Sequence, residues 1–257
     1  MRMLRTLEIA KALAVAILLL ASTGTAWADE VYRILPLGDS ITQAEINRAS
    51  YRYPLWKLLV DSDIEFDFVG SLKKQQDRYS KGTPPQPDYK GLGFDRDHEG
   101  HFGWNIDEII KGRDFDNGSG SGKLEKWVEG YEADIALVHL GTNDAFNRHP
   151  KETSVEEIRE VVRILREDNP NITILLAKLI PASRKPGDSG AVESLNELIP
   201  GLAEDMHTED SPVVLVDQFE SFDVEAHTYD GVHPNEAGEE KMARVWFEAI
   251  KEVVESN

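Results

Sequence analysis

Residues 31–42, VYRILPLGDSIT, lead from an apolar run straight into polar side chains. The run at 31–37 is short and rich in apolar and β-branched residues, which predicts a buried strand that Gly38 ends. Asp39 and Ser40 follow at once. Parallel α/β sheets bind ligands beyond the carboxyl ends of their strands, so this stretch predicts a site at the edge of such a sheet.

Strands and helices alternate along the rest of the chain. Short apolar runs predict further strands, and apolar residues at three- and four-residue spacing predict helices. The predicted strands are 65–69, 134–140, 171–179 and 212–216, and the predicted helices are 51–60, 105–111, 123–129, 154–167, 191–205 and 235–254. This alternation is typical of an α/β protein. We expect a three-layer α/β/α fold with a five-stranded parallel sheet in flavodoxin-like order.

Four residues predict how individual helices begin or bend. Ser154 and Glu157 form a capping-box pattern at the start of their helix. Pro200 predicts a bend, because proline lacks the N–H that a helix interior uses. Asn235 is the expected N-cap of the closing helix.

The composition limits the classes of protein to which the chain can belong. The chain has 257 residues, a hydrophobic fraction of 40%, no cysteine and a formal net charge of −19. The length suits a single α/β domain, and the lack of cysteine excludes disulfides, thiol catalysis and thiolate metal sites. A chain this negative repels phosphate backbones and anionic surfaces. We therefore expect no nucleic-acid partner and a neutral substrate.

Residues 1–28 have the layout of a secretory signal peptide. Its parts are positive charges at Arg2, Arg5 and Lys11, an apolar run at 12–21, and a small-x-small cleavage site at 26–28. The apolar run is about half as long as a membrane span requires, and an uncleaved anchor is the alternative. We expect a mature domain at 29–257 that is secreted or periplasmic, without stable membrane association once the signal is removed.

Polar clusters follow three of the predicted strands. They are Gly38 to Thr42, Gly141 to Asp144, and Asp230 to Pro234. Because the carboxyl ends of parallel strands meet at one edge of a sheet, we expect the three clusters to lie together.

These clusters hold the groups that a serine esterase needs. A serine hydroxyl is a weak nucleophile, so it requires a base, and the base requires an orienting partner. We expect Ser40 to be the nucleophile, His233 the base and Asp230 its partner, since one short loop can present both Asp230 and His233. The oxyanion formed by attack on a carbonyl needs preorganised donors. We expect these to be the N–H of Ser40, the N–H of Gly103 and the side-chain amide of Asn143.

The same residues resemble a known family, the SGNH (GDSL-type) hydrolases. The resemblance covers nearly the whole mature chain, with the blocks in the family's order. They are Gly38-Asp39-Ser40, the isolated Gly103, Gly141-Thr142-Asn143-Asp144, and Asp230-Gly231-Val232-His233. The surroundings of Ser40 lack the Gly-x-Ser-x-Gly elbow, which disfavours an ordinary α/β-hydrolase. The resemblance implies the same nucleophile, base, partner and oxyanion donors.

Further blocks are similar to carbohydrate esterase family 3, a group that deacetylates xylan. They are Ser50 to Trp56, Phe68 to Ser71, Asp97 to Trp104, and Asp230 to Asn235. This resemblance implies an esterase that removes O-acetyl groups from a carbohydrate through an acetyl-serine, with acetylated xylan or a related plant or algal polysaccharide as substrate. It implies no metal and no cofactor.

The sequence departs from that family at two places. Phe102 stands where a small residue, often serine, is expected, which puts the acyl pocket and the substrate in doubt more than the reaction. Residues 43–45 lack a glycine expected nearby. The segment before Gly103, residues 71–102, shows no helical or strand periodicity, which is typical of a functional or mobile loop. Whether this loop closes over substrate stays open.

Other polar and aromatic residues near the blocks have less specific interpretations. We expect Asp39 and Asp144 to fix loops. Asp39 is also a weak candidate for contact with substrate. His98, Glu99 and His101 do not have the His-Glu-x-x-His spacing of a zinc protease, so we expect no metal there. His139 is expected to be buried and hydrogen-bonded. Trp104 either stacks on a sugar ring or packs inward.

Two other functions stay open on the sequence alone. The first keeps the chemistry and changes the substrate to longer acyl chains, as in a lipid esterase or thioesterase. The second is a sugar-binding protein on an inactive hydrolase scaffold, which the intact set of Ser40, Asp230 and His233 disfavours.

Overall fold

The computed structural model describes residues 31–77, 86–116, 120–183 and 190–256. The predicted signal peptide at 1–28 lies outside the described residues. Among the described helices, none combines the length and the apolar character that crossing a membrane requires.

A parallel sheet forms the centre of the described chain. Its strands are β1 (Tyr32–Gly38), β2 (Phe66–Phe68), β3 (Glu99–Gly100), β4 (Ile135–His139), β5 (Thr173–Lys178) and β6 (Val213–Asp217). The order β2-β1-β4-β5-β6 is flavodoxin-like, which confirms the predicted fold class. The two-residue β3 was not predicted, because so short a strand has no period to read. It pairs with the end of β1, on the side where β2 pairs with the start.

The central strands β1, β4 and β5 are buried on both faces of the sheet. Side chains alternate between two apolar clusters, because successive residues of a strand point to opposite faces. Leu35 and Leu37 of β1 face one cluster, whereas Ile34 faces the other. Burial on both faces explains why these strands are continuous apolar runs in the sequence.

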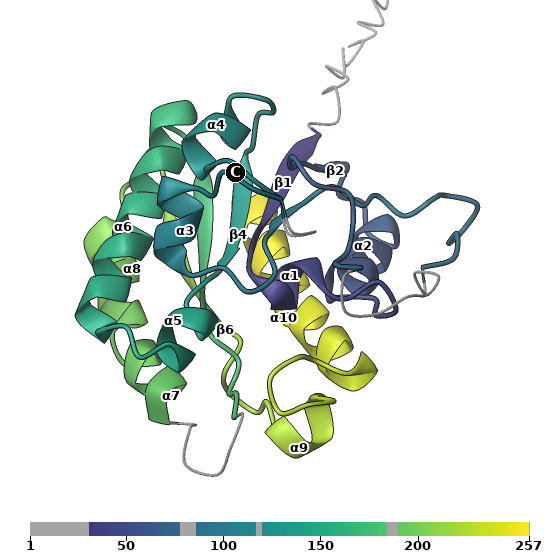
Figure 1. The fold of residues 1–257 in the computed structure, drawn as a ribbon. Coiled ribbons are helices and arrows are strands. Elements are labelled where there is room, and N and C mark those ends of the chain that lie inside the picture. The colour runs from purple at the N-terminus through teal and green to yellow at the C-terminus, as the bar shows by residue number, and fades with distance from the viewer. Residues whose placement is uncertain (1–30, 78–85, 117–119, 184–189, 257) are drawn as a thin grey trace, which may run out of the picture. The chain divides into compact units, whose positions relative to one another are not determined.

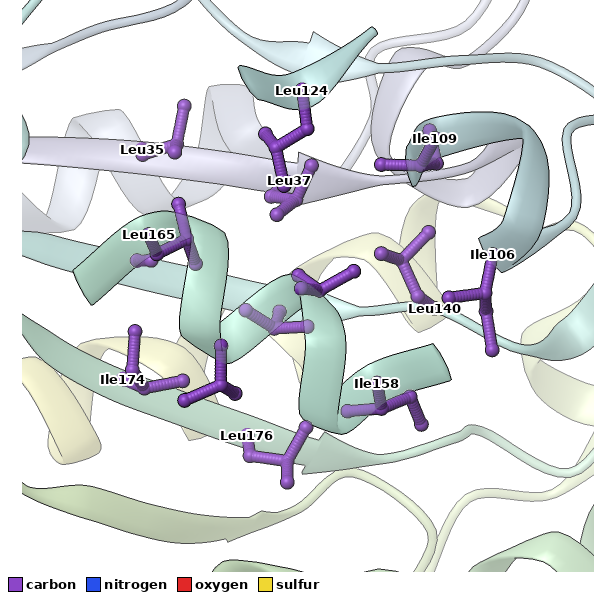
Figure 2. Packing of buried hydrophobic residues seen from close by; sticks show 14 of the residues in the cluster. Leu35, Leu37, Ile106, Ile109, Leu124, Leu140, Ile158, Leu165, Ile174 and Leu176 are labelled. Atoms are coloured by element: carbon purple, nitrogen blue, oxygen red, sulfur yellow. The ribbon is translucent and has the colours of Figure 1, made fainter. Parts of the chain in front are cut away.

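Helices cover each face of this sheet. They are α1 (Ser40–Gln43), α2 (Arg52–Val60), α3 (Ile106–Lys111), α4 (Leu124–Val128), α5 (Thr142–Phe146), α6 (Lys151–Asp168), α7 (Gly190–Asn196), α8 (Ile199–Met206), α9 (Val224–His227) and α10 (Glu236–Ser256). The layer containing α3, α4, α6, α7 and α8 packs on one face, and α2 and α10 pack on the other (Figure 1). In Figure 2, Ile158 and Leu165 of α6 lie over the sheet near Leu176 and Leu35.

Two predicted helix features were wrong. Helix α6 begins at Lys151 with Pro150 as N-cap, so Ser154 lies inside the helix, buried, and does not cap it. The predicted helix 191–205 is two helices, α7 and α8. The helical hydrogen bonding is interrupted before Pro200, and Pro200 lies in the first turn of α8. Backbone N–H groups in the first turn of a helix have no helical acceptor, so the missing N–H of proline costs no hydrogen bond there. The predicted N-cap of α10 is confirmed, since Asn235 Oδ1 accepts the N–H of Gly238 at 3.1 Å.

Candidate active site

Ser40 is the first residue of α1, and a single residue separates it from the end of β1. Asp39 caps this helix, because its Oδ1 accepts the N–H of Ile41 at 2.9 Å. Any side chain at Gly38 would collide with Thr42 Oγ1 and the His139 carbonyl. The glycine therefore permits the tight passage from strand to helix, and the passage places Ser40 at the carboxyl edge of the sheet.

His233 reaches Ser40 from the loop between α9 and α10. Its Nε2 lies 2.9 Å from Ser40 Oγ, and its Nδ1 lies 2.7 Å from Asp230 Oδ2. The other carboxylate oxygen of Asp230 accepts the backbone N–H groups of Val232 and His233, at 3.0 and 2.7 Å. Asp230 thus shapes the turn as well as holding the imidazole, which explains why the two residues stand only three positions apart.

The charge of Asp230 suits this role. Partial burial raises its pKa, but hydrogen bonds from the His233 ring and backbone outweigh burial and lower it to about 2. Asp230 is therefore ionised at neutral pH and acts only as an acceptor. The Nδ1 of His233 must then carry the proton, which leaves the lone pair of Nε2 facing the Ser40 hydroxyl.

The three predicted oxyanion donors also lie together. The side-chain amide nitrogen of Asn143 lies 2.9 Å from the carbonyl of Trp104, next to Gly103, and 3.4 Å from Asp39, next to Ser40. The bond to Trp104 holds the amide in place, while the contact with Asp39 is long for a hydrogen bond. These contacts place the Asn143 amide between the residue after Gly103 and the residue before Ser40.

Gly103 faces open space. Its φ is +76°, and a methyl group built on it would meet no atom within 4 Å. The positive φ disfavours residues other than glycine here, and the open space in front of the backbone agrees with the predicted role of Gly103 as an oxyanion donor.

Asp39 lies beneath the site and is fully buried. Burial raises its pKa to about 6, although the hydrogen bond from the Ile41 N–H opposes the shift. Its carboxylate caps α1 and lies beside Asn143. The buried carboxylate and these two contacts agree with the expected loop-fixing role of Asp39, while its contact with substrate stays a weak prediction.

Trp104 is also buried, with 1% of its surface exposed. Its ring lies against the rings of His101 and Trp127, at centroid distances of 4.7 and 5.8 Å, with the Arg113 guanidinium 4.8 Å from its centroid. The buried ring favours the inward-packing interpretation of Trp104 over stacking on a sugar. Its contribution to the site is its backbone carbonyl, which holds Asn143.

Glu99 and His101, which precede Gly103, belong to a buried hydrogen-bonded network. Glu99 accepts hydrogen bonds from Ser71 Oγ at 2.6 Å, Tyr131 Oη at 2.6 Å and His101 Nε2 at 3.1 Å. The N–H of His101 donates to the Gly38 carbonyl at 2.9 Å. These bonds fix the loop that carries Gly103 against the end of β1.

A group able to ligate a metal lies elsewhere in the described residues, at Asp144, His149 and Glu157. His149 Nδ1 lies 3.2 Å from Asp144 Oδ1, and Asp144 also accepts the N–H of Ile106. Burial raises the pKa of Asp144 to about 7. The expected loop-fixing role of Asp144 agrees with its bond to the start of α3.

Sequence reasoning missed the aromatic surroundings of His233. The rings of Phe102 and Tyr229 lie nearly parallel to the imidazole, with centroids 5.5 and 5.7 Å away. Gln43 Oε1 accepts the N–H of Phe102 at 2.8 Å. Phe102 drew attention in the sequence only as a departure from a family, and Tyr229 gave no signal beyond standing next to Asp230.

Comparisons with known proteins agree with this geometry. The chain matches the model of the GDSL-like Lipase/Acylhydrolase family over residues 37–241. A multidomain esterase of Ruminococcus flavefaciens is 30% identical over 231 residues, which is 85% of this chain. The chain spans only 28% of that relative's length.

Solved structures extend the likeness to the fold. A carbohydrate esterase family 3 structure from Talaromyces cellulolyticus has 27% identity and a TM-score of 0.72, covering 88% of this chain and 100% of that one. An acetyl esterase mutant with an acetate ion has the same identity and TM-score, covering 88% and 99%. A family 3 carbohydrate esterase from Clostridium thermocellum shares the fold, with 24% identity and a TM-score of 0.68, covering 88% and 98%. The match over most of the sequence confirms the SGNH resemblance, and the chain belongs to the GDSL-like lipase/acylhydrolase family.

Proposed function

We propose that the protein is a serine esterase that removes acetyl groups from a carbohydrate. The observation that carries the proposal is the chain of short contacts from Ser40 Oγ to His233 and on to Asp230, at 2.9 and 2.7 Å. This geometry is what an activated serine requires. The family membership and the carbohydrate esterase family 3 neighbours support the choice of ester hydrolysis over other acyl transfers.

In the first half-reaction, Ser40 Oγ attacks the acetyl carbonyl carbon while His233 Nε2 takes the hydroxyl proton. The carbonyl oxygen becomes an oxyanion, which the Ser40 N–H, the Gly103 N–H and the Asn143 amide stabilise. When the C–O bond to the sugar breaks, the imidazolium returns the proton to the leaving sugar oxygen. The product is an acetyl-serine and a free hydroxyl on the carbohydrate.

In the second half-reaction, His233 takes a proton from water as the water oxygen attacks the acetyl carbon. The tetrahedral intermediate collapses, Ser40 Oγ leaves and recovers the proton from His233, and acetic acid departs and gives its proton to the solvent as acetate. The same donors hold the oxyanion in both halves.

Three observations support an acetylated polysaccharide as substrate. Structural neighbours include carbohydrate esterases and an acetyl esterase crystallised with acetate. The net charge of −19 favours a neutral substrate over an anionic one. A signal peptide at 1–28, which we propose from the sequence, would bring the enzyme to polymers outside the cytoplasm. Xylan is the proposed polymer.

The experiment is acetate release from acetylated xylan by the mature chain, with Ser40→Ala as control. We expect release by the wild type and none by the variant. Ser40-dependent cleavage of an aryl acetate without release from xylan would keep the esterase and reject xylan. Ester cleavage that survives Ser40→Ala would reject the proposed nucleophile.

Longer acyl chains are the second candidate, because the matching family includes lipases. A series of aryl esters from acetyl to octanoyl separates the two. The proposal predicts that kcat/KM falls steeply beyond acetyl. Equal values for acetyl and octanoyl esters would favour a lipid substrate.

A further inference from the structure

The imidazole of His233 lies against two aromatic rings. Phe102 and Tyr229 are tilted from it by only 16° and 17°, with centroids at 5.5 and 5.7 Å. We propose that Phe102 and Tyr229 are positioning residues that hold His233 in place during the second half-reaction. This inference rests on the proposed function.

Each of the two rings is held by contacts of its own residue. The Arg48 guanidinium lies 4.0 Å from the centroid of the Tyr229 ring, and the N–H of Tyr229 donates to the His233 carbonyl at 3.0 Å. The N–H of Phe102 donates to Gln43 Oε1 at 2.8 Å. Offset parallel rings at these distances attract each other, so the stack resists tilting of the imidazole out of its plane.

The need for such support changes during the cycle. In the free enzyme, two hydrogen bonds hold the imidazole within its plane, one to Asp230 and one to Ser40. Once Ser40 carries the acetyl group, its oxygen has no proton to donate, and the bond to Nε2 is lost. The remaining polar partner, Asp230, has a side chain that is 41% exposed. At this stage the imidazole must still aim Nε2 at the attacking water.

The ring contacts do not depend on the state of Ser40. They therefore supply a larger share of the restraint in the acetyl-enzyme than in the free enzyme. Removing a flat ring should slow the attack of water more than the attack of Ser40. The predicted signature is accumulation of the acetyl-enzyme, which a general loss of folded protein would not produce.

The test compares Phe102→Leu and Tyr229→Leu, which keep apolar volume and remove the ring, with Tyr229→Phe, which keeps the ring. Phe115→Leu, at an exposed phenylalanine outside the stack, is the matched control for the leucine substitution. Each variant is mixed with an aryl acetate. The release of the phenol is followed before the steady state, and the acetylated fraction is measured by mass spectrometry. Thermal unfolding of every variant confirms the folded state.

We expect both ring-to-leucine variants to lose roughly 10- to 100-fold in steady-state kcat, because small misplacements of a catalytic group have effects of this order. We also expect a burst of phenol and a visible acetyl-enzyme in these variants. Tyr229→Phe and Phe115→Leu should stay within about twofold of the wild type, well under the effect of such a misplacement.

Unchanged kcat in the folded leucine variants would overturn the inference. So would a fall in kcat without acetyl-enzyme, or a Tyr229→Phe variant as impaired as Tyr229→Leu. Ser40→Ala in parallel separates this failure from a failure of the proposed function. If wild-type hydrolysis does not depend on Ser40, the proposed function is wrong and the inference falls with it.

Discussion

At the scale of single residues, the site depends on hydrogen bonds whose direction is fixed. Burial raises the pKa of Asp230, but hydrogen bonds from the His233 ring and from backbone N–H groups outweigh burial and lower it to about 2. Asp230 is therefore ionised at neutral pH. An ionised partner on Nδ1 leaves only one productive tautomer of the imidazole. We therefore expect the proposed chemistry of Ser40 to depend on the charge of Asp230 as well as on its position.

Replacing Asp230 by asparagine tests that dependence. The new side chain would keep an oxygen for the Val232 and His233 N–H groups, but its amide would donate toward Nδ1 and favour the wrong tautomer. We expect Asp230→Asn to lower kcat by roughly 10²- to 10⁴-fold, as loss of a triad carboxylate does elsewhere. Steady-state hydrolysis of an aryl acetate measures it. Wild-type kcat in a folded variant would show that Asp230 does not orient the base.

Gly103→Ala tests the open space at the oxyanion site. The φ of +76° is disfavoured for alanine by about 1–2 kcal/mol, and the methyl group would enter the space assigned to substrate. We expect lower thermal stability and a fall in kcat/KM of roughly 10²-fold or more, of the order seen when one oxyanion donor is lost. Gly201→Ala is the matched control, since Gly201 lies in α8 with open space around it. That variant should keep its activity and gain about 0.5–1 kcal/mol of stability. Equal activity of the two variants would show that Gly103 is not an oxyanion donor.

Several residue roles were open to prediction from the sequence, and others were not. Ser40, Asn143 and His233 each follow a predicted strand or lie on a loop beyond one, so topology alone brings them to one edge. The orientation of Trp104 stayed open because one aromatic residue between a glycine and a short helix carries no periodicity that shows its buried side. The contact of Phe102 with His233 joins distant parts of the chain, and side-chain packing of that kind leaves no local pattern.

At the scale of elements, the closing helix α10 is tied to the loop before α2 by a buried carboxyl. Glu239 Oε1 accepts the N–H of Ser50 at 2.9 Å, and only 5% of the residue is exposed. Burial raises the pKa of Glu239 to about 7, although the Ser50 N–H and Arg48 oppose the shift. The helix pair thus packs best when this group is protonated.

We expect Glu239→Gln to change how the stability of the folded protein depends on pH. The raised pKa means that the folded state holds its proton between pH 4.5 and about 7 while the unfolded chain releases it, so wild-type stability falls as pH rises through this range. Glutamine keeps the acceptor oxygen and has no proton to lose. We expect the variant to become more stable than the wild type by up to about 3 kcal/mol above pH 7, and to gain nothing below pH 4.5. Urea unfolding at about pH 4 and about pH 8, on either side of this window, measures it. A gain of the same size at both pH values would contradict the assignment.

Most elements were predictable because both faces of the sheet are covered, which gives the central strands nearly continuous apolar runs. The failures occur where the signals are short or ambiguous. Helix α6 starts about one turn before the predicted cap at Ser154, with Lys151 as its first residue. The short helices α1, α5 and α9 have too few residues to display a helical period.

At the scale of the whole molecule, the dominant feature is negative charge. The formal net charge of −19 is spread over a chain whose charged residues are mostly at the surface. Such a charge repels itself in the compact state and disfavours anionic ligands. It agrees with the proposed action on neutral acetylated sugars.

Salt should therefore stabilise the folded chain. The screening length falls from about 30 Å at 0.01 M to about 10 Å at 0.1 M ionic strength, which weakens the repulsion between distant carboxylates. We expect the midpoint of thermal unfolding to rise over this range, equally with sodium and potassium chloride. A midpoint that is flat or falls would show that local ion pairs, and not the net charge, set the response to salt.

The central claim is that Ser40 is the activated nucleophile and His233 its base. The most direct test is to treat the enzyme with an aryl diethyl phosphate and map the modified residue by mass spectrometry, with His233→Ala beside the wild type. We predict one diethylphosphoryl group, on Ser40, formed far more slowly in His233→Ala. Modification at another residue, or equal rates in the two proteins, would contradict the account.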